Sequence, residues 1–369
     1  NNFKGDFYLS LNEEKYELFN NSLSFFSGDT FFDGNLSFIP SALYTSGDLS
    51  LFLLLKDISV KKVSNLIPNI KATKFIKSWI NASIDCGNLN SASLLYRGPV
   101  DNKFTDTTSS FQMDFNLIDS CLKFTSMNIN EIALFGEVDN ASFKGMLTEA
   151  NVFDSETISD IEISRDINNI YSLSIKGESH GPVSSIVDLH AAYNSSFVDS
   201  VSSGEHLTEF SFYTPLLNSF DLLKKSSLLK VKTSISDTSL VLVDNNFLLK
   251  NLEASLNYNS SEGFKKSSLS FDINSVPLQF DLSTKIIGKK HASVITSKSE
   301  IKLRKLFFFS NYSKYISGSS LFDIDFILPG YIRGEILSTP RLNIVSSLEG
   351  TEMKLFSPFN KDPKSVIDF

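Results

Sequence analysis

Apolar and polar residues alternate with a period of two along much of the chain. The alternation is clear in FQMDFNL (residues 111–117) and LFDIDFIL (residues 321–328), and it recurs in YSLSI, LSFDI and LQFDL. A period of two places one set of side chains on one face of a β-strand. The apolar sets are Phe111, Met113, Phe115 and Leu117; Tyr171, Leu173 and Ile175; Leu269, Phe271 and Ile273; Leu278, Phe280 and Leu282; and Phe322, Ile324, Phe326 and Leu328.

This alternation favours an antiparallel sheet, because parallel strands are buried on both faces and have continuous apolar runs. Asn274 and Pro277 lie between two of the strands and suit a hairpin. We therefore predict a mostly β fold, an antiparallel sheet with its strands in meander order and with one or two short helices.

Two segments break the alternation and are helix candidates. Residues 68–87 have apolar residues near helical spacing between Pro68 and Gly87, and residues 304–318 form a weaker candidate. Each is followed by a strand that ends at a glycine, so the two segments form an internal echo roughly 230 residues apart. We predict one continuous β-repeat fragment over 1–369, with a central helix-plus-strands unit at 66–200 and a C-terminal-side β unit at 201–369, whose helix lies near 304–317.

Composition and charge exclude several classes of protein. Hydrophobic residues make up 41% and charged residues 21%, which indicates a globular chain, and no stretch has the roughly 18 to 20 apolar residues of a membrane-spanning helix. A net charge of -8 with scattered Lys and Arg argues against nucleic-acid binding. Cys86 and Cys121 could form a disulfide or remain buried thiols, and the sequence leaves both open.

The chain lacks the residue patterns of cofactor and metal sites. Neither GxGxxG nor GxxxxGK[ST] occurs, and the four histidines have no metal-ligand spacing. His180 and His190 are interpreted as surface or strand-end imidazoles, and Asp323 and Asp325 as the solvated face of a strand. We predict no catalytic residue, no metal and no cofactor, and therefore no enzyme.

Several short motifs follow one another in a recognisable order. The first group is Leu66, Ile67 and Pro68, then Trp79, Ile80 and Gly87, then Tyr96, Arg97 and Gly98; the second is Leu173, Ile175, Gly177 and Gly181; the third is Ser346, Leu348, Gly350, Leu355, Pro358 and Lys361. Their order resembles the YhdP group of AsmA-like proteins, in the superfamily that includes TamB, over most of the chain. Phe356 and Asn360 stand where that group has Pro and Gly.

The resemblance implies a long curved antiparallel sheet that forms an open trough, a repeating β-groove. It further implies a bridge-like lipid transfer protein of the Gram-negative envelope. Such a protein lies in the periplasm, is anchored to the inner membrane by a segment outside this chain, and carries phospholipid between the inner and outer membranes along an apolar β-groove. Its partners are phospholipid acyl chains and the two membranes, and the alternating apolar sets above are the expected groove lining.

Two other interpretations stay open. On composition alone, the apolar face is the closed core of a β-sandwich. The functional alternative is a non-enzymatic envelope scaffold or assembly factor that binds a client polypeptide, since an exposed sheet edge can pair with another strand.

Overall fold

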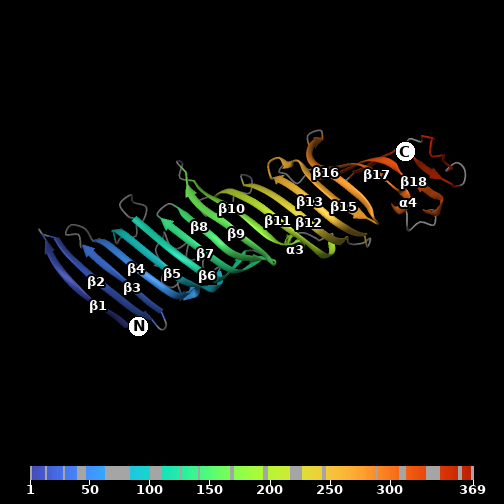
Figure 1. The fold of residues 1–369 in the computed structure, drawn as a ribbon. Coiled ribbons are helices and arrows are strands. Elements are labelled where there is room, and N and C mark those ends of the chain that lie inside the picture. The colour runs from blue at the N-terminus through green and yellow to red at the C-terminus, as the bar shows by residue number, and fades with distance from the viewer. Residues whose placement is uncertain are drawn as a thin grey trace. The chain divides into compact units, whose positions relative to one another are not determined.

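The described part of the chain folds largely into β-strands (Figure 1). The structure is a computed structural model that describes residues 2–12, 15–27, 30–39, 47–62, 84–99, 110–124, 127–139, 142–166, 170–193, 198–216, 227–242, 247–287, 290–306, 313–329, 341–355 and 360–366. Among them no helix is long and apolar enough to cross a bilayer.

The strands in chain order are β1 Asn2–Asn12, β2 Lys15–Ser27, β3 Thr30–Ile39, β4 Asp48–Ser59, β5 Ile84–Pro99, β6 Ser110–Phe124, β7 Met127–Asp139, β8 Phe143–Val152, β9 Ser155–Arg165, β10 Tyr171–Pro182, β11 Val198–Leu216, β12 Leu228–Leu242, β13 Phe247–Asn259, β14 Gly263–Phe264, β15 Ser267–Ile273, β16 Val276–Ile287, β17 Lys290–Ile301, β18 Ile316–Gly318, β19 Ser320–Pro329, β20 Arg341–Val345 and β21 Thr351–Met353. The helices are α3 Val183–Tyr193, α4 Leu303–Leu306 and the 3-10 turn η1 Ser313–Tyr315.

Nineteen of these strands form one open antiparallel sheet, and β18 and β21 form a separate two-stranded sheet. Neighbours in the sequence are neighbours in the sheet, from β1 through β9 and again from β11 through β13. The order then continues from β15 through β17 to β19 and β20. The predicted antiparallel meander is confirmed.

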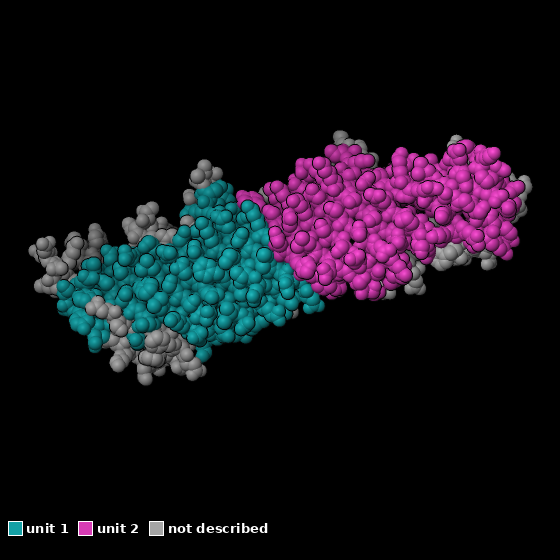
Figure 2. Space-filling view, in the orientation of Figure 1, with its two compact units in different colours: residues 1–177, 215–222 teal, residues 178–214, 223–369 magenta. Residues whose placement is uncertain are grey.

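The chain divides into two compact units, coloured separately in Figure 2. Unit 1 comprises residues 1–177 and 215–222, and it contains β1 to β9. Unit 2 comprises residues 178–214 and 223–369, and most of its sheet lies between β11 and β20.

The predicted helices are only partly present. Residues 68–83 of the first candidate lie outside the described residues, and its last four residues, 84–87, belong to β5. The second candidate, residues 304–318, is wrong at its end: α4 covers Leu303–Leu306, residues 307–312 lie outside the described residues, η1 covers Ser313–Tyr315, and Ile316 enters β18. Ile316 is buried there with Leu303 and Leu348, and this apolar contact outweighs the helical spacing.

In the described part of the chain, three connections between strands begin with helical backbone, about 120 residues apart, and we call them helical crossovers. Helical backbone begins at Val60 after β4, at Val183 after β10 and at Leu303 after β17, and all three side chains are buried. The two similar segments expected from the sequence are therefore the first and third of three repeats. The middle repeat, which contains α3, was not predicted. The stretch ESHGPVSSIVDLH, residues 178–190, leads into α3 and combines a Gly-Pro start with apolar residues at helical spacing, which was the available signal.

The strand that follows the first crossover carries a disulfide. Cys86 and Cys121 are bonded and lie directly opposite each other on β5 and β6, which settles the choice that the sequence left open. The adjacent Gly87 has a φ of 122°, a conformation that L side chains rarely adopt, and a Cβ at this position would collide with Ser120. Glycine is therefore required where β5 returns to the sheet.

The buried core follows the ends of the strands at which the crossovers begin. One cluster in unit 1 surrounds Ile58 and Val60, and one in unit 2 surrounds Ile301 and Leu303. A smaller cluster in unit 2 contains Leu240, Leu249 and Leu252. Within the described residues, no second sheet of comparable size covers either unit, so the closed β-sandwich expected from composition alone is wrong.

Candidate functional site

One face of unit 1 carries an unbroken row of apolar side chains across six strands. Strand register places the members of this row directly opposite one another from β4 to β9. At about 4.8 Å between strands the row extends about 24 Å, which exceeds the roughly 15 Å depth of one hydrocarbon leaflet. The row is Leu53, Leu94, Met113, Val138, Phe143 and Ile163.

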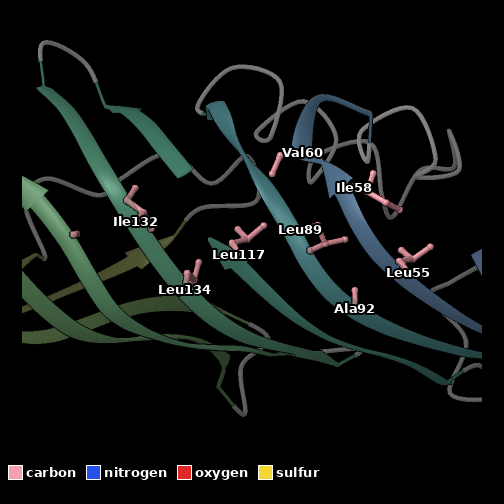
Figure 3. Close-up of a cluster of buried hydrophobic side chains, with 9 residues drawn as sticks. Leu55, Ile58, Val60, Leu89, Ala92, Leu117, Ile132 and Leu134 are labelled. Carbon is pink, nitrogen blue, oxygen red and sulfur yellow. The ribbon is translucent and has the colours of Figure 1, made fainter. Parts of the chain in front are cut away.

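All six side chains of this row are half-buried, so their neighbours along the sheet shield them only in part. Burial is complete toward the end of the sheet at which β4 ends and β5 begins, where Ile58, Leu89 and Ile132 are 1%, 2% and 1% exposed. Figure 3 shows this closed end of the face, with Leu55, Leu117 and Ile132. Unit 1 thus has a packed apolar end and a partly open apolar row on the same face.

Two glycines let aromatic rings lie on this face. Gly136 and Gly145 are directly opposite each other on β7 and β8, and a Cβ on either one would collide with the ring of Phe115 or Phe143. The two rings stack with centroids 6.2 Å apart and an interplanar angle of 11°. The missing side chains therefore produce a flat aromatic surface without interrupting the strands.

The other face of unit 1 carries a polar row from β6 to β9, beside exposed apolar side chains such as Phe135 and Met146. Asp114, Glu137, Lys144 and Glu162 are directly opposite one another from β6 to β9, and the last three are exposed. Ser93 donates a hydrogen bond to Asp114 over 3.1 Å. Each strand therefore separates an apolar face from a solvated face, as the alternation predicts.

Unit 2 repeats this arrangement with other residues. Leu282, Ile295, Phe326 and Leu342 form a directly opposed apolar row across β16, β17, β19 and β20. A second row runs from β12 to β16 through Ile235, Ala254, Leu269 and Phe280, and the Phe280 ring stacks on that of Phe271 at 5.3 Å.

A buried polar chain interrupts the apolar face of unit 2. His206 on β11 lies opposite Ile235, and its Nε2 is 3.0 Å from Ser185 Oγ of α3, so the helix lies against this face. Ser185 Oγ donates to the Pro182 carbonyl over 2.6 Å. Ser185 must therefore accept from Nε2–H, which leaves Nδ1 to accept from Thr208 Oγ1 at 3.1 Å. Burial, and secondarily the nearby His180, lowers the pKa of His206, which favours this neutral form.

The structure places the predicted lining residues in several environments. Those of β6, β15, β16 and β19 lie in one register-matched face of their own unit. Leu117, Leu278, Leu282 and Phe322 are buried in that face, and the other members of those four strands are half-buried. In β10 every residue from Tyr171 to Ile175 is half-buried, so burial does not distinguish its two faces. The alternation in the sequence identified which side chains share the apolar face. It did not distinguish the packed part of that face from the partly open part.

Most of the apolar face of unit 1 in β3, β4 and β5 was not predicted from the sequence. Leu49, Leu51 and Leu53 belong to it, but they occur in LSLFLLL, where Phe52 and Leu54 on the other face hide the alternation. Strand pairing with Tyr96 and Leu94 identifies the side to which these leucines point. An uninterrupted apolar run gives no such assignment.

The polar residues considered as site candidates make contacts that belong to the fold. Asp323 and Asp325 are exposed, and Asp323 pairs with Lys298 at 3.3 Å. Residues 177–181, Gly-Glu-Ser-His-Gly, match the GxSxG pattern of hydrolases, but Ser179 lies inside β10 and not at a strand-to-helix turn. Adjacent His180 points to the opposite face of the strand. Among the described residues, no three His, Cys, Asp or Glu side chains could together hold a metal ion.

The comparisons with known proteins agree with the motif order. No curated protein and no solved structure matches the chain. A family model described as YhdP protein matches residues 1–369, and the chain therefore belongs to the YhdP protein family, within the AsmA-like lipid transfer protein group.

Proposed function

We propose that this chain is a segment of a bridge-like protein that carries phospholipid between the inner and outer membranes along an apolar β-groove. The observation that carries the proposal is the half-buried row from Leu53 to Ile163, a continuous apolar surface on a sheet that no second sheet covers among the residues the structure describes. Family membership supports the same function.

The groove acts by replacing water. Exposing an acyl chain to water costs about 0.8 kcal/mol per CH₂, and contact with a continuous apolar face removes much of that cost along the path. The phospholipid headgroup stays on the wet side of the groove. This transport needs no nucleophile, metal or cofactor, so we propose a protein that is not an enzyme.

Two structural features fit the proposed location and path. A disulfide such as Cys86–Cys121 persists in oxidising compartments, among them the bacterial periplasm. The packed cluster around Ile58 gives the face a rigid margin, and the half-buried row beside it remains available to acyl chains. We therefore assign the lipid path of unit 1 to the row and not to the cluster.

The test compares two directly opposed pairs on the same two strands. Val138 and Phe143 face the apolar side of β7 and β8, whereas Phe135 and Met146 are opposite each other on the other side. The Val138→Asp/Phe143→Asp variant should lose at least about fivefold in co-purified phospholipid, because carboxylates in the row must be desolvated by acyl chains. Phe135→Asp/Met146→Asp, at side chains 43% and 50% exposed, should retain the wild-type amount.

Both variants are extracted from membranes in mild detergent, and bound lipid is counted by native mass spectrometry. Circular dichroism must show unchanged strand content in both. Equal lipid in the two variants, or a lipid-free wild-type chain, would reject the proposal. A polypeptide trapped in the groove in place of lipid would support the scaffold alternative.

A further inference from the structure

The last strand of the large sheet, β20, has an exposed and unprotected edge. All five residues from Arg341 to Val345 are exposed, and within the described part of the chain β20 pairs with β19 alone. Leu342 and Val345 are each 58% exposed and Ile344 is 48% exposed, so apolar side chains protrude on both faces.

Sheet edges in soluble proteins are normally protected against pairing with other chains by Pro, inward-pointing charges or bulges. β20 contains no Pro or Gly, no residue with positive φ, and no register shift against β19. Its single charge, Arg341, stands at one end. An apolar edge with none of these devices is a template for another strand.

The apolar row of unit 2 ends at this edge. Along Leu282, Ile295, Phe326 and Leu342 the first side chain is 9% exposed and the last is 58% exposed. The side chain at the edge lacks the neighbour that each inner member has. A further strand beside β20 would cover Leu342 and extend the apolar face by one strand.

We propose that β20 binds an extended peptide segment of a partner protein by strand addition. The segment is apolar at every second position, on the face shared by Leu342 and Ile344. It also carries an acidic residue near Arg341, because β19 places Ile327 and not an acid opposite that guanidinium. A five-residue strand, about 17 Å long, suits short-peptide recognition. It is too small for the roughly 1,000 Å² that a stable dimer of two copies needs.

The probe is a fluorescent synthetic peptide with the sequence of residues 320–328 and a charged, soluble tail. This sequence already pairs with β20 from the other side, where Phe326 and Ile324 are opposite Leu342 and Ile344, so its apolar alternation matches that of β20. Fluorescence anisotropy against the 369-residue chain should give saturable binding. Hydrogen exchange should show slower amide exchange at Leu342–Val345 when the peptide is present.

Leu342→Lys/Ile344→Lys should weaken peptide binding at least about tenfold, because these exposed positions tolerate lysine in the folded chain while the charges oppose strand addition. Asn343→Pro, which removes one backbone N–H, should weaken it similarly. The control is Leu321→Lys, equally exposed at 58% on β19 but away from the edge, and it should stay within about twofold of wild type.

Three results would overturn the proposal. The first is the absence of saturable peptide binding, and the second is equal affinity in the edge variants and in the Leu321→Lys control. The third is a peptide-free dimer in sedimentation that the edge lysines abolish, because the edge would then serve a second copy of the chain. None of these readouts involves lipid, so the outcome is independent of the lipid experiment.

Discussion

Units 1 and 2 build the same strand junction from different residues. In each unit the strand that returns from a helical crossover contains, within its first seven residues, a small residue followed by a glycine, and the next strand places a left-handed aspartate and a buried hydroxyl against it. The matching residues are Cys86 and Gly87 against Asp119, Ser120 and Cys121 in unit 1, and Ser203 and Gly204 against Asp237, Thr238 and Ser239 in unit 2.

The shared features belong to the backbone. Asp119 and Asp237 both have a φ of 49°, and Gly87 and Gly204 have φ values of 122° and 110°. The hydroxyls of Ser120 and Thr238 each donate to the carbonyl two residues earlier, at 3.2 and 3.0 Å. These features produce a bulge, which increases the local twist of the sheet.

The difference lies in what links the two strands. Cys86 and Cys121 form a disulfide, whereas the directly opposed Ser203 and Ser239 of unit 2 are not covalently linked. Ser203 instead donates to the Asp237 carbonyl over 3.0 Å. The comparison shows that the junction forms without the disulfide, which adds stability to a geometry that the glycine and the buried hydroxyl already define.

A third copy lies near the C-terminus. Gly318, with a φ of 86°, is directly opposite the fully buried Thr351, and Gly350 takes the place of the left-handed aspartate. The neighbouring Ser317 donates to a Glu352 carboxylate oxygen at 3.0 Å. The three repeats thus differ in the interaction at this position. It is a disulfide at Cys86, a side-chain-to-backbone hydrogen bond at Ser203 and a side-chain pair at Ser317.

The largest expected effect is from replacing the junction glycine. Gly204→Val should destabilise unit 2 by about 4 kcal/mol, because the positive φ is strained for valine and its Cβ would collide with Thr238. Gly87→Val should cost unit 1 a similar amount. Hydrogen-exchange mass spectrometry measures each unit by its own peptides. Glu205→Val, an exposed neighbour, is the control, and a change below about 1 kcal/mol in either glycine variant would refute the shared constraint.

Removing the disulfide should have the next largest effect. Cys86→Ser/Cys121→Ser gives unit 1 the serine pair of unit 2, and it should cost unit 1 about 3 kcal/mol, since the bond closes a loop of 35 residues in the unfolded chain. Amide protection in unit 2 should not change. Loss of the β5–β6 ladder in this variant would contradict our view that the backbone alone defines the junction.

The reverse exchange, from the serine pair to a disulfide, tests the same comparison in unit 2. Ser203→Cys/Ser239→Cys places two thiols at the position of the unit 1 disulfide, and oxidation should stabilise unit 2 by about 2 kcal/mol, somewhat less than the native bond because engineered disulfides rarely fit fully. Thiol titration and the change in amide protection on reduction measure it. Ser202→Cys/Ser239→Cys, which moves one thiol out of register, should not close the bond. If both variants oxidise equally, the equivalence of the junctions is wrong.

The sequence predicted the features that a period of two encodes, and it could not predict those that depend on strand pairing. FQMDFNL gave both the strand and its apolar face, as β6 confirms. The junction repeat was hidden because its recurring elements are single residues, such as Gly87 and Gly204, whose role is a backbone angle. Leu117 and Met113 are equivalent in the pattern, yet only Leu117 is buried, because burial depends on distance from the crossover.

The hydrogen-bonded chain through His206 should make the stability of unit 2 depend on pH. No matching group is described in unit 1. The neutral His206 ring accepts from Thr208 and donates to Ser185 on α3. Protonation would put a second N–H against the Thr208 hydroxyl, which would have to reverse. Because burial lowers the pKa of His206 in the folded chain, the unfolded chain binds the proton more readily.

Unit 2 should therefore keep its full stability above about pH 6.5, the value for an unfolded-chain histidine, and lose a small part as the pH falls from there toward the lower folded pKa. This is the smallest of the four effects, because a single proton is involved. Amide protection measured between pH 7 and pH 5 should fall in α3 and β11 but not in β5 or β6. His206→Gln, which cannot titrate but can still donate to Ser185, should remove this slope, whereas His180→Gln at an exposed position should largely retain it. An unchanged slope in His206→Gln would show that another group senses the pH, and the hydrogen-bond chain would then only fix α3 to the sheet.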